Sequence, residues 1–205
     1  MPKTVGQSAQ RAAPVRSAPR PAESLALSDL DTQLMMRVRE GCPEAANTLV
    51  RRNFDRVARY VSRVLGNQRA IEDISQEVFL NVLSSAPRYK PTARFSTWLY
   101  RVATNTALSH LSRNGRQSAH DVHEQDRAGG AAPPDHQMSL DEVRARVTAA
   151  VDDLPINQRV ALTLFEYEDL TYQQIATVMD LTVEAVRCLL NRARSTLRQK
   201  LGDLT

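Results

Sequence analysis

A basic segment that lacks acids is the part of this sequence whose residues most clearly indicate a chemical role. Between Val78 and His120 the chain has no Asp or Glu, whereas Arg and Lys supply six positive charges. The same segment contains Phe95, Tyr100 and the only tryptophan of the chain, Trp98. Positive charge without interleaved acids is the footprint of a polyanionic partner. The segment therefore predicts that a negatively charged partner binds here.

The strongest local pattern lies near the C-terminus, in LTYQQIATVMDLTVEAVRCLLNRARSTLRQKL. Thr171 can cap a short helix, and Gln174 completes a capping box with it. A second helix starts after MDLT and carries five Arg and Lys residues against one Glu. Two helices joined by so short a turn indicate a helix-turn-helix, whose second helix enters the major groove of DNA.

The second helix of this motif is predicted to have two distinct faces. Its apolar residues recur every three or four positions and form a buried stripe of Val186, Leu190, Ala193 and Leu197. The opposite side carries Arg187, Asn191, Arg194 and Arg198. In the turn before it, Asp180 stands where glycine is usual, and a left-handed conformation there costs Asp of the order of 1 kcal/mol.

The elements that position these residues are all predicted to be helices, because the long segments repeat their apolar residues with a helical period. Gly and Pro separate helices expected at about residues 29–40, 44–65, 71–83, 95–113, 139–153, 156–168, 172–179 and 183–201. In the fourth of them, an apolar stripe starts at Phe95, and Arg101 and Asn105 lie one turn apart beside it. The expected fold class is all-α, with two small helical domains joined by a flexible linker.

Composition divides the chain into four parts. Residues 1–24 form a basic tail rich in Pro and Ala that is predicted to be disordered, and residues 25–113 form the first domain. Residues 114–138 contain Gly-Gly and Pro-Pro with few apolar residues, which is typical of a flexible linker. Residues 139–205 form the second domain, and the 42% of hydrophobic residues suffice for compact cores.

Several classes of protein are disfavoured by the sequence. No apolar run reaches the roughly 18 residues that a membrane span needs, and the N-terminus has no secretory signal pattern. Cys42 and Cys188 are far apart, which fits a reducing cytoplasm. The chain has no nucleophile motif, phosphate loop or metal-ligand spacing, and His120 and His123 have no partner pair. We therefore expect a cytoplasmic protein without enzymatic activity or cofactor.

Three motifs together resemble those of a known family. IEDISQEVFLNVL and RFSTWLYRVATNTALSHLSR are followed, after the linker, by LPINQRVALTLFEYEDLTYQQIATVMDLTVEAVRCLLNRARSTLRQKL. In their order and spacing they are similar to the bacterial sigma factors of the extracytoplasmic-function group, over residues 29–201. The resemblance implies a protein that binds core RNA polymerase and directs promoter-specific initiation, through sigma regions 2 and 4.

The resemblance assigns polymerase binding to the helix at 71–83, which would pack against a coiled coil of the largest polymerase subunit. The matching residues are Asp73, Gln76, Glu77 and Phe79. Asp73 and Glu77 are four residues apart and share a face, so they could pair with basic residues of the partner. An ordinary solvated face is the alternative for the acids, and a core position is the alternative for Phe79.

For region 2 the resemblance implies capture of the melted minus-10 element. The residues that match are Tyr89, Lys90, Arg94, Trp98, Arg101 and Asn105. Arg and Lys would hold phosphates, and a flipped base would need a pocket with side-chain hydrogen bonds. Trp98 lies on the apolar stripe and could instead belong to the core, and Asn105 could instead mark a helix bend or cap.

For region 4 the resemblance implies reading of the minus-35 element in the major groove. The matching residues are Thr182, Glu184, Arg187, Cys188, Asn191 and Arg192. Arg can read guanine with two hydrogen bonds and Asn can read adenine. Arg194 and Arg198 are interpreted either as phosphate contacts or as solvated side chains, and Cys188 is a minor candidate for a redox switch.

The predicted partners are core RNA polymerase, promoter DNA and an anti-sigma factor. Residues 117–138 of the linker carry a net charge of −3 from Asp121, Glu124, Asp126, Asp135 and Arg127, and the linker could thread toward the RNA path or act as a plain tether. A two-domain operator-binding regulator that is independent of polymerase is the alternative function. A nucleic-acid enzyme is a further alternative that no motif supports.

Overall fold

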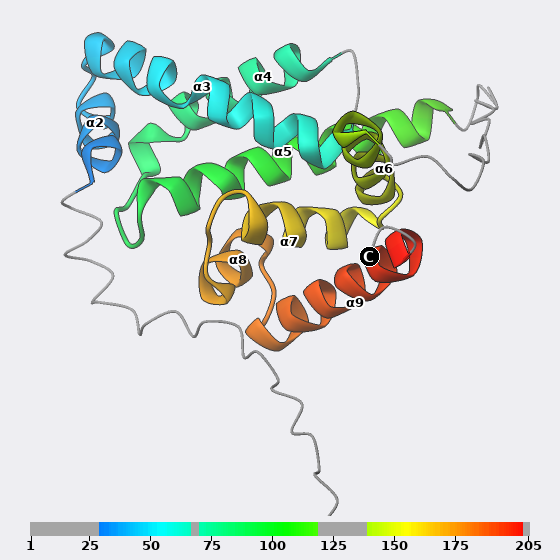
Figure 1. The fold of residues 1–205 in the computed structure, drawn as a ribbon. Coiled ribbons are helices and arrows are strands. Elements are labelled where there is room, and N and C mark those ends of the chain that lie inside the picture. The colour runs from blue at the N-terminus through cyan, green and yellow to red at the C-terminus, as the bar shows by residue number, and fades with distance from the viewer. Residues whose placement is uncertain (1–28, 67–69, 119–138, 203–205) are drawn as a thin grey trace, which may run out of the picture.

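The fold is taken from a computed structural model that describes residues 29–66, 70–118 and 139–202, without the side chains of residues 114–118. In these ranges every regular element is a helix, which confirms the predicted all-α class (Figure 1). The helices are α2 (Leu30–Arg39), α3 (Pro43–Leu65), α4 (Ile71–Ser84), the short 3₁₀ helix η1 (Ala86–Arg88), α5 (Phe95–Ser118), α6 (Leu140–Asp152), α7 (Ile156–Glu166), α8 (Tyr172–Met179) and α9 (Val183–Leu201).

The first half of the chain is a bundle in which α3, α4 and α5 pack against one another, with α2 across the start of α3 (Figure 1). The apolar stripe predicted from Phe95 contributes Leu99 of α5 to its core, and Val57, Tyr60 and Val61 of α3 are also almost fully buried. A buried polar contact lies inside the bundle, where the hydroxyls of Tyr60 and Thr104 are 2.5 Å apart. These contacts fix α5 and so position the basic segment.

The second half consists of α6 to α9, in which α8 and α9 form the predicted helix-turn-helix. Val186, Leu190 and Ala193 are fully buried as expected, while Leu197 is half-buried and still packs against the core. The predicted capping box Thr171–Gln174 is present before α8, and a second box, Ser139–Glu142, precedes α6. The start of each of these helices is therefore specified by its own sequence.

The turn between α8 and α9 has the strained conformation that the sequence predicts. Asp180 adopts φ 56° and ψ 46°, which is the left-handed region. This conformation lets the backbone N–H of Leu181 donate to the carbonyl of Ala176 at 3.0 Å. The bond ends α8 abruptly and redirects the chain into α9.

The expected start of the linker is corrected by the structure. We predicted a linker from residue 114, but α5 continues to Ser118. Gly115 did not end the helix, because an isolated glycine lowers helix stability by only about 1 kcal/mol relative to alanine. The predicted tail, residues 1–24, and residues 119–138 lie outside the described residues.

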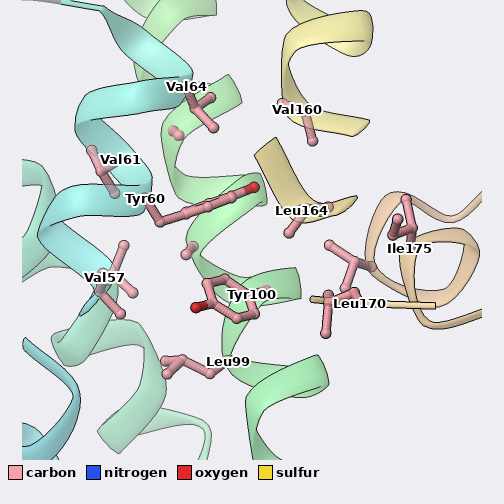
Figure 2. Close-up of a cluster of buried hydrophobic side chains, with 14 of the residues drawn as sticks. Val57, Tyr60, Val61, Val64, Leu99, Tyr100, Val160, Leu164, Leu170 and Ile175 are labelled. Carbon is pink, nitrogen blue, oxygen red and sulfur yellow. The ribbon is translucent and has the colours of Figure 1, made fainter. Parts of the chain in front are cut away.

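The two halves share one continuous core. Val57, Val61 and Tyr100 of the first half belong to the same buried cluster as Leu164 and Ile175 of the second half (Figure 2). These residues come from different halves of the sequence, and α5 packs against α8 while α3 packs against α7. The linker therefore joins two halves that are already in apolar contact.

Arg159 of α7 adds a polar connection beside this core. Its guanidinium donates to the carbonyl oxygens of Val64 at 3.1 Å and Leu154 at 3.2 Å, and also to that of Asp152. The carbonyls at the end of a helix have no partner within it, and Arg159 supplies one for the last turn of α3. One arginine of the second half therefore ties the ends of helices from both halves.

No helix among the described residues combines the length and the apolar character needed to cross a membrane.

Candidate nucleic-acid interface

The basic segment presents a polar stripe along α5 and the loop before it. Arg94, Trp98, Arg101 and Asn105 follow one another at intervals of four, three and four residues, so they share one side of the helix. Arg94, Arg101 and Asn105 are exposed, and Trp98 is half-buried. The opposite side is buried through Phe95, Leu99 and Ala103. We call Arg94, Trp98, Arg101 and Asn105 the α5 stripe.

Trp98 is neither a pure core residue nor a free surface residue. Its ring lies 5.0 Å from that of Tyr89 and 5.8 Å from that of Phe95, so one edge is packed while part remains accessible. A rigidly packed indole next to exposed arginines can offer a stacking surface for an unpaired base. Trp98 is therefore partly packed and partly accessible, and its contact with DNA stays a prediction.

Tyr89 was predicted to contact the minus-10 element, but its side chain does not belong to the exposed surface. Its side chain is only 2% exposed, and its ring packs edge-on against Trp98. Burial raises the pKa of the Tyr89 hydroxyl, so this group remains neutral at physiological pH. The reason for the correction is that the aromatic residues of this region cluster with one another. Tyr89 supports the loop, and Lys90 beside it is exposed.

Two residues of α2, which sequence reasoning missed, hold this loop in place. Arg39 donates to the carbonyl of Tyr89 at 3.4 Å, across 50 positions of sequence. The buried hydroxyl of Thr32 accepts the backbone N–H of Phe95 at 3.3 Å and donates to Asp29. Thr32 thus satisfies a free N–H at the start of α5. No local pattern signals contacts of this kind.

The acids assigned to polymerase binding lie on the outer face of α4. Asp73 and Gln76 are exposed, and Glu77 is half-exposed and accepts two hydrogen bonds from Arg113, at 2.9 and 3.3 Å. Leu80 is 68% exposed and lies seven residues after Asp73, on the same face. Sequence reasoning missed Leu80, although this spacing could have identified it. We call Asp73, Gln76, Glu77 and Leu80 the α4 face.

Phe79 lies on the other side of α4 and cannot contact a partner directly. It is 4% exposed, and its ring stacks on that of Phe54 with 5.8 Å between centroids. The core position that the sequence offered as an alternative is therefore the correct one. Phe79 contributes to a surface only by fixing α4 against α3.

The third surface is the exposed side of α9, which we call the α9 face and define by six residues. Thr182, Glu184, Arg187, Cys188, Asn191 and Arg192 are all exposed. The last five recur at helical spacing opposite the buried residues of α9, and Thr182 caps the helix by accepting the N–H of Ala185 at 3.2 Å. The N-terminal half of α9 therefore presents exposed Asn and Arg side chains, as a recognition helix must, and Arg187 lies over the Tyr172 ring at 5.9 Å from its centre.

Arg194 is half-buried and pairs with a neighbouring helix, while its contact with phosphate stays a prediction. Its guanidinium donates to Glu166 at 3.1 Å and lies 5.0 Å from the centre of the Phe165 ring. Both partners belong to α7, so Arg194 connects the recognition helix to its support. Arg198 is exposed, so the two arginines differ in their surroundings.

Among the described residues there is no cluster of His, Cys, Asp and Glu side chains that could hold a metal ion. The three surfaces instead offer exposed charges, amides and one packed indole. These groups can bind phosphates, base edges and unstacked bases.

Comparison with known proteins agrees with this interpretation. Residues 49–117 match the family model of Sigma-70 region 2, and residues 144–197 match that of Sigma-70, region 4. RNA polymerase sigma-H factor of Pseudomonas aeruginosa is 34% identical over 183 residues, which cover 85% of this chain and 95% of that protein. ECF RNA polymerase sigma-E factor of Escherichia coli K12 is 35% identical, with the same coverage.

The fold and its surfaces define a helical DNA-binding protein with a helix-turn-helix in its second half. The chain belongs to the sigma-70 family, within its extracytoplasmic-function (ECF) group. It is a sigma factor, which associates with RNA polymerase and directs initiation at specific promoters, and sigma factors are not enzymes. An operator-binding regulator independent of polymerase is not favoured.

Solved structures show the same fold. The chain named CnrH, solved in complex with the cytosolic domain of CnrY, has a TM-score of 0.63 and 21% identity, covering 86% of this chain and all of that one. The sigma factor RpoE of Bartonella quintana, solved with the anti-sigma factor NepR, also has a TM-score of 0.63, with 18% identity, and covers 76% of this chain and 96% of that one.

Proposed function

We propose that the α5 stripe captures the non-template strand of the melted minus-10 element. The observation that carries this proposal is the combination of Arg94, Arg101 and Asn105, all exposed, with the half-packed Trp98 on one side of a rigid helix. The arginines can hold phosphates, and the amide of Asn105 can hydrogen-bond a base edge. Because the inner side of α5 is anchored in the core, the stripe is presented on a rigid support.

The α9 face is proposed to read the minus-35 element in the major groove. Arg187 and Asn191 are four residues apart and exposed, and such side chains can contact successive base pairs. Thr182 and Glu184 lie at the N-terminus of α9, where Thr182 is committed to capping and Glu184 is free to influence sequence preference.

The α4 face is proposed to bind the largest subunit of core polymerase at a helical coiled coil. Its exposed carboxylates can pair with basic side chains, and Leu80 supplies an apolar anchor among them. An exposed leucine beside charged residues has the composition of a protein interface rather than of a nucleic-acid interface.

An anti-sigma factor is proposed as a further partner, since two sigma-type chains of the same fold were solved with protein partners. The proposed place of action is the cytoplasm, where polymerase and promoter DNA are found.

The test is open-complex formation by purified protein and core polymerase on a duplex promoter. Arg101→Glu should abolish permanganate reactivity of unpaired thymines, because it places a like charge beside the strand. Arg51→Glu is a matched control, because Arg51 is an exposed arginine of α3 outside the stripe. Equal melting with both variants would contradict the assignment of α5.

A further inference from the structure

Glu168, in the turn between α7 and α8, is the one charged residue that is buried among the residues that the structure describes. It is only 8% exposed. A buried carboxylate is unfavourable by several kcal/mol unless hydrogen bonds and opposite charges compensate it. The origin of its partners therefore decides what holds this turn in place.

The side chains that pair with Glu168 all come from the other half of the molecule. Arg56 of α3 donates to it at 3.1 Å, the Tyr100 hydroxyl of α5 donates to the same oxygen, and Arg63 lies 3.9 Å from the second oxygen. Burial, and then the hydrogen bond to Glu168, raise the pKa of Tyr100, so its hydroxyl remains a donor. These contacts join positions 68 to 112 residues apart in sequence.

Further contacts between the halves surround Glu168 and its partners. Arg63 lies over the ring of Tyr167, 4.2 Å from its centre, and Gln174 of α8 is 3.4 Å from the hydroxyl of Thr97. Figure 2 shows Tyr100 facing Leu164 and Leu170 across the boundary between the halves. The halves are therefore held by apolar packing, by the Arg159 contact with Val64 and by one ionic cluster around the buried Glu168, which we define as Glu168, Arg56, Arg63 and Tyr100 and call the Glu168 cluster.

This closed packing conflicts with simultaneous binding of both promoter elements, a step that rests on the proposed function. The minus-10 and minus-35 elements are about 25 base pairs, or about 85 Å, apart on B-form DNA. A compact chain of this length is roughly 40 Å across. The α5 stripe and the α9 face cannot both reach their elements while the halves stay packed.

We propose that the Glu168 cluster is an autoinhibitory latch, which keeps the free sigma factor closed and must break before the promoter is bound. The twenty residues 119–138 could reach about 70 Å when extended, so covalent connection does not prevent opening. Opening exposes Leu164, Leu170 and the carboxylate of Glu168 to water. The free energy of polymerase binding has to compensate the loss of these contacts. Polymerase binding and closure therefore compete.

Energy transfer within the full chain tests the latch directly. Trp98 is the only tryptophan, and Cys42→Ser leaves Cys188 as the only thiol for an acceptor dye. One probe then lies in each half, and the Cys42→Ser protein, with the residue of the native sequence at every other position, should show efficient transfer. Glu168→Gln, which removes the charge and keeps the shape, should lower transfer without polymerase.

Glu166→Gln is the matched control, because Glu166 lies two residues away, is exposed, and pairs with Arg194 inside the second half. It should leave transfer unchanged. Arg56→Gln removes the charge that pairs with Glu168 from the first half and should lower energy transfer as Glu168→Gln does. Agreement between the two variants would exclude a folding defect specific to position 168. Circular dichroism should show unchanged helicity for all three variants.

Transcription supplies a second readout with unlabelled protein. If closure competes with binding, Glu168→Gln should reduce the sigma-factor concentration for half-maximal run-off by about three- to tenfold. A disulfide between Thr97→Cys and Gln174→Cys, whose native side chains are 3.4 Å apart, in a Cys42→Ser chain that keeps Cys188, should abolish run-off until reductant is added. The parent Cys42→Ser chain, oxidised in the same way, should retain run-off.

Low transfer in the Cys42→Ser protein, or unchanged transfer in both Glu168→Gln and Arg56→Gln, would overturn the latch. Full run-off by the cross-linked chain would overturn autoinhibition. Loss of transfer in the variants, with no promoter-specific transcript from any protein, would leave the latch standing and refute the proposed function instead.

Discussion

Asn105 is the residue at which base capture and simple attachment to DNA can be separated. Asn105→Ala removes one amide and no charge, so electrostatic attraction and its salt dependence should remain. We expect this variant to hold promoter duplex through α9 but to form few open complexes, measured by permanganate reactivity. A pre-melted promoter should restore only part of the loss, because the flipped base still lacks its partner.

Ser109→Ala provides the control for this prediction. Ser109 lies one turn after Asn105 on the same helix and is also exposed. It should melt the promoter as the wild type does. Normal melting by Asn105→Ala would show that the amide serves the helix rather than the DNA.

Arg187 tests base reading by α9. Arg187→Ala should weaken binding to the cognate minus-35 element by about 1–3 kcal/mol and relax the preference at one base pair. Titration against a panel of single-base variants measures both effects. Arg198→Ala, three turns further along α9, should at most weaken all duplexes equally, and an equal loss for Arg187→Ala would make Arg187 a phosphate contact.

The residues whose roles could not be predicted from sequence are those whose burial depends on distant segments. Phe79 and Tyr89 lie within motifs that also contain surface residues, and their burial follows from the rings of Phe54 and Trp98. The exposure of residues on regular helices, such as Asn105 and Asn191, was easier to predict, because helical spacing alone separates them from the core.

At the scale of elements, helix positions were predicted well because their signals are local. Ser139 and Thr171 cap their helices within three residues of sequence, and Pro43 begins α3. The end of α5 was predicted wrongly because the residues from 114 to 118 have no apolar repeat in the sequence that would indicate a helix. Capping information is local, whereas the end of a solvated helix is weakly specified.

The left-handed turn before α9 gives a stability prediction. Asp180→Gly removes the steric penalty at φ 56° and should raise the melting temperature by about 1–4 °C. Asp180→Ala keeps the Cβ atom and loses the polar side chain, so it should not be stabilising. Thermal unfolding followed by circular dichroism compares the two, and equal melting temperatures would show that the turn is unstrained.

The α4 face predicts which changes affect polymerase without affecting the fold. Asp73→Arg combined with Glu77→Arg should weaken binding to core polymerase while helicity is retained. Leu80→Ala should also weaken binding, and its 68% exposure means that the melting temperature should be nearly unchanged. Pull-down with core polymerase and thermal unfolding measure these effects, and unchanged affinity in both variants would refute the polymerase-binding role of α4.

At the scale of the whole molecule, the shared core predicts that the halves associate without a covalent link. A protease site inserted between Gly129 and Gly130 allows the linker to be cut after the full chain has folded. The two fragments should elute together in gel filtration, because Val57, Tyr100 and Leu164 remain buried against one another. Separate elution would show that the packing depends on the linker.

The contact between the halves was the part of the fold that the sequence did not predict. Two helical domains and a linker were identified from composition and periodicity, but the pairing of Glu168 with Arg56 joins positions 112 residues apart. A single chain carries no local sign of such a pair, and Glu168 looks like any turn residue between two helices.

The shared core also constrains how the protein is made. Val57, Val61 and Tyr100 leave the ribosome before Leu164 and Ile175, which cover them in the finished chain. At about 5–20 residues per second, the 57 residues between the end of α5 and Ile175 take about 3–12 s to synthesise. During that interval the nascent first half exposes an apolar patch, on which a chaperone can bind before the second half arrives.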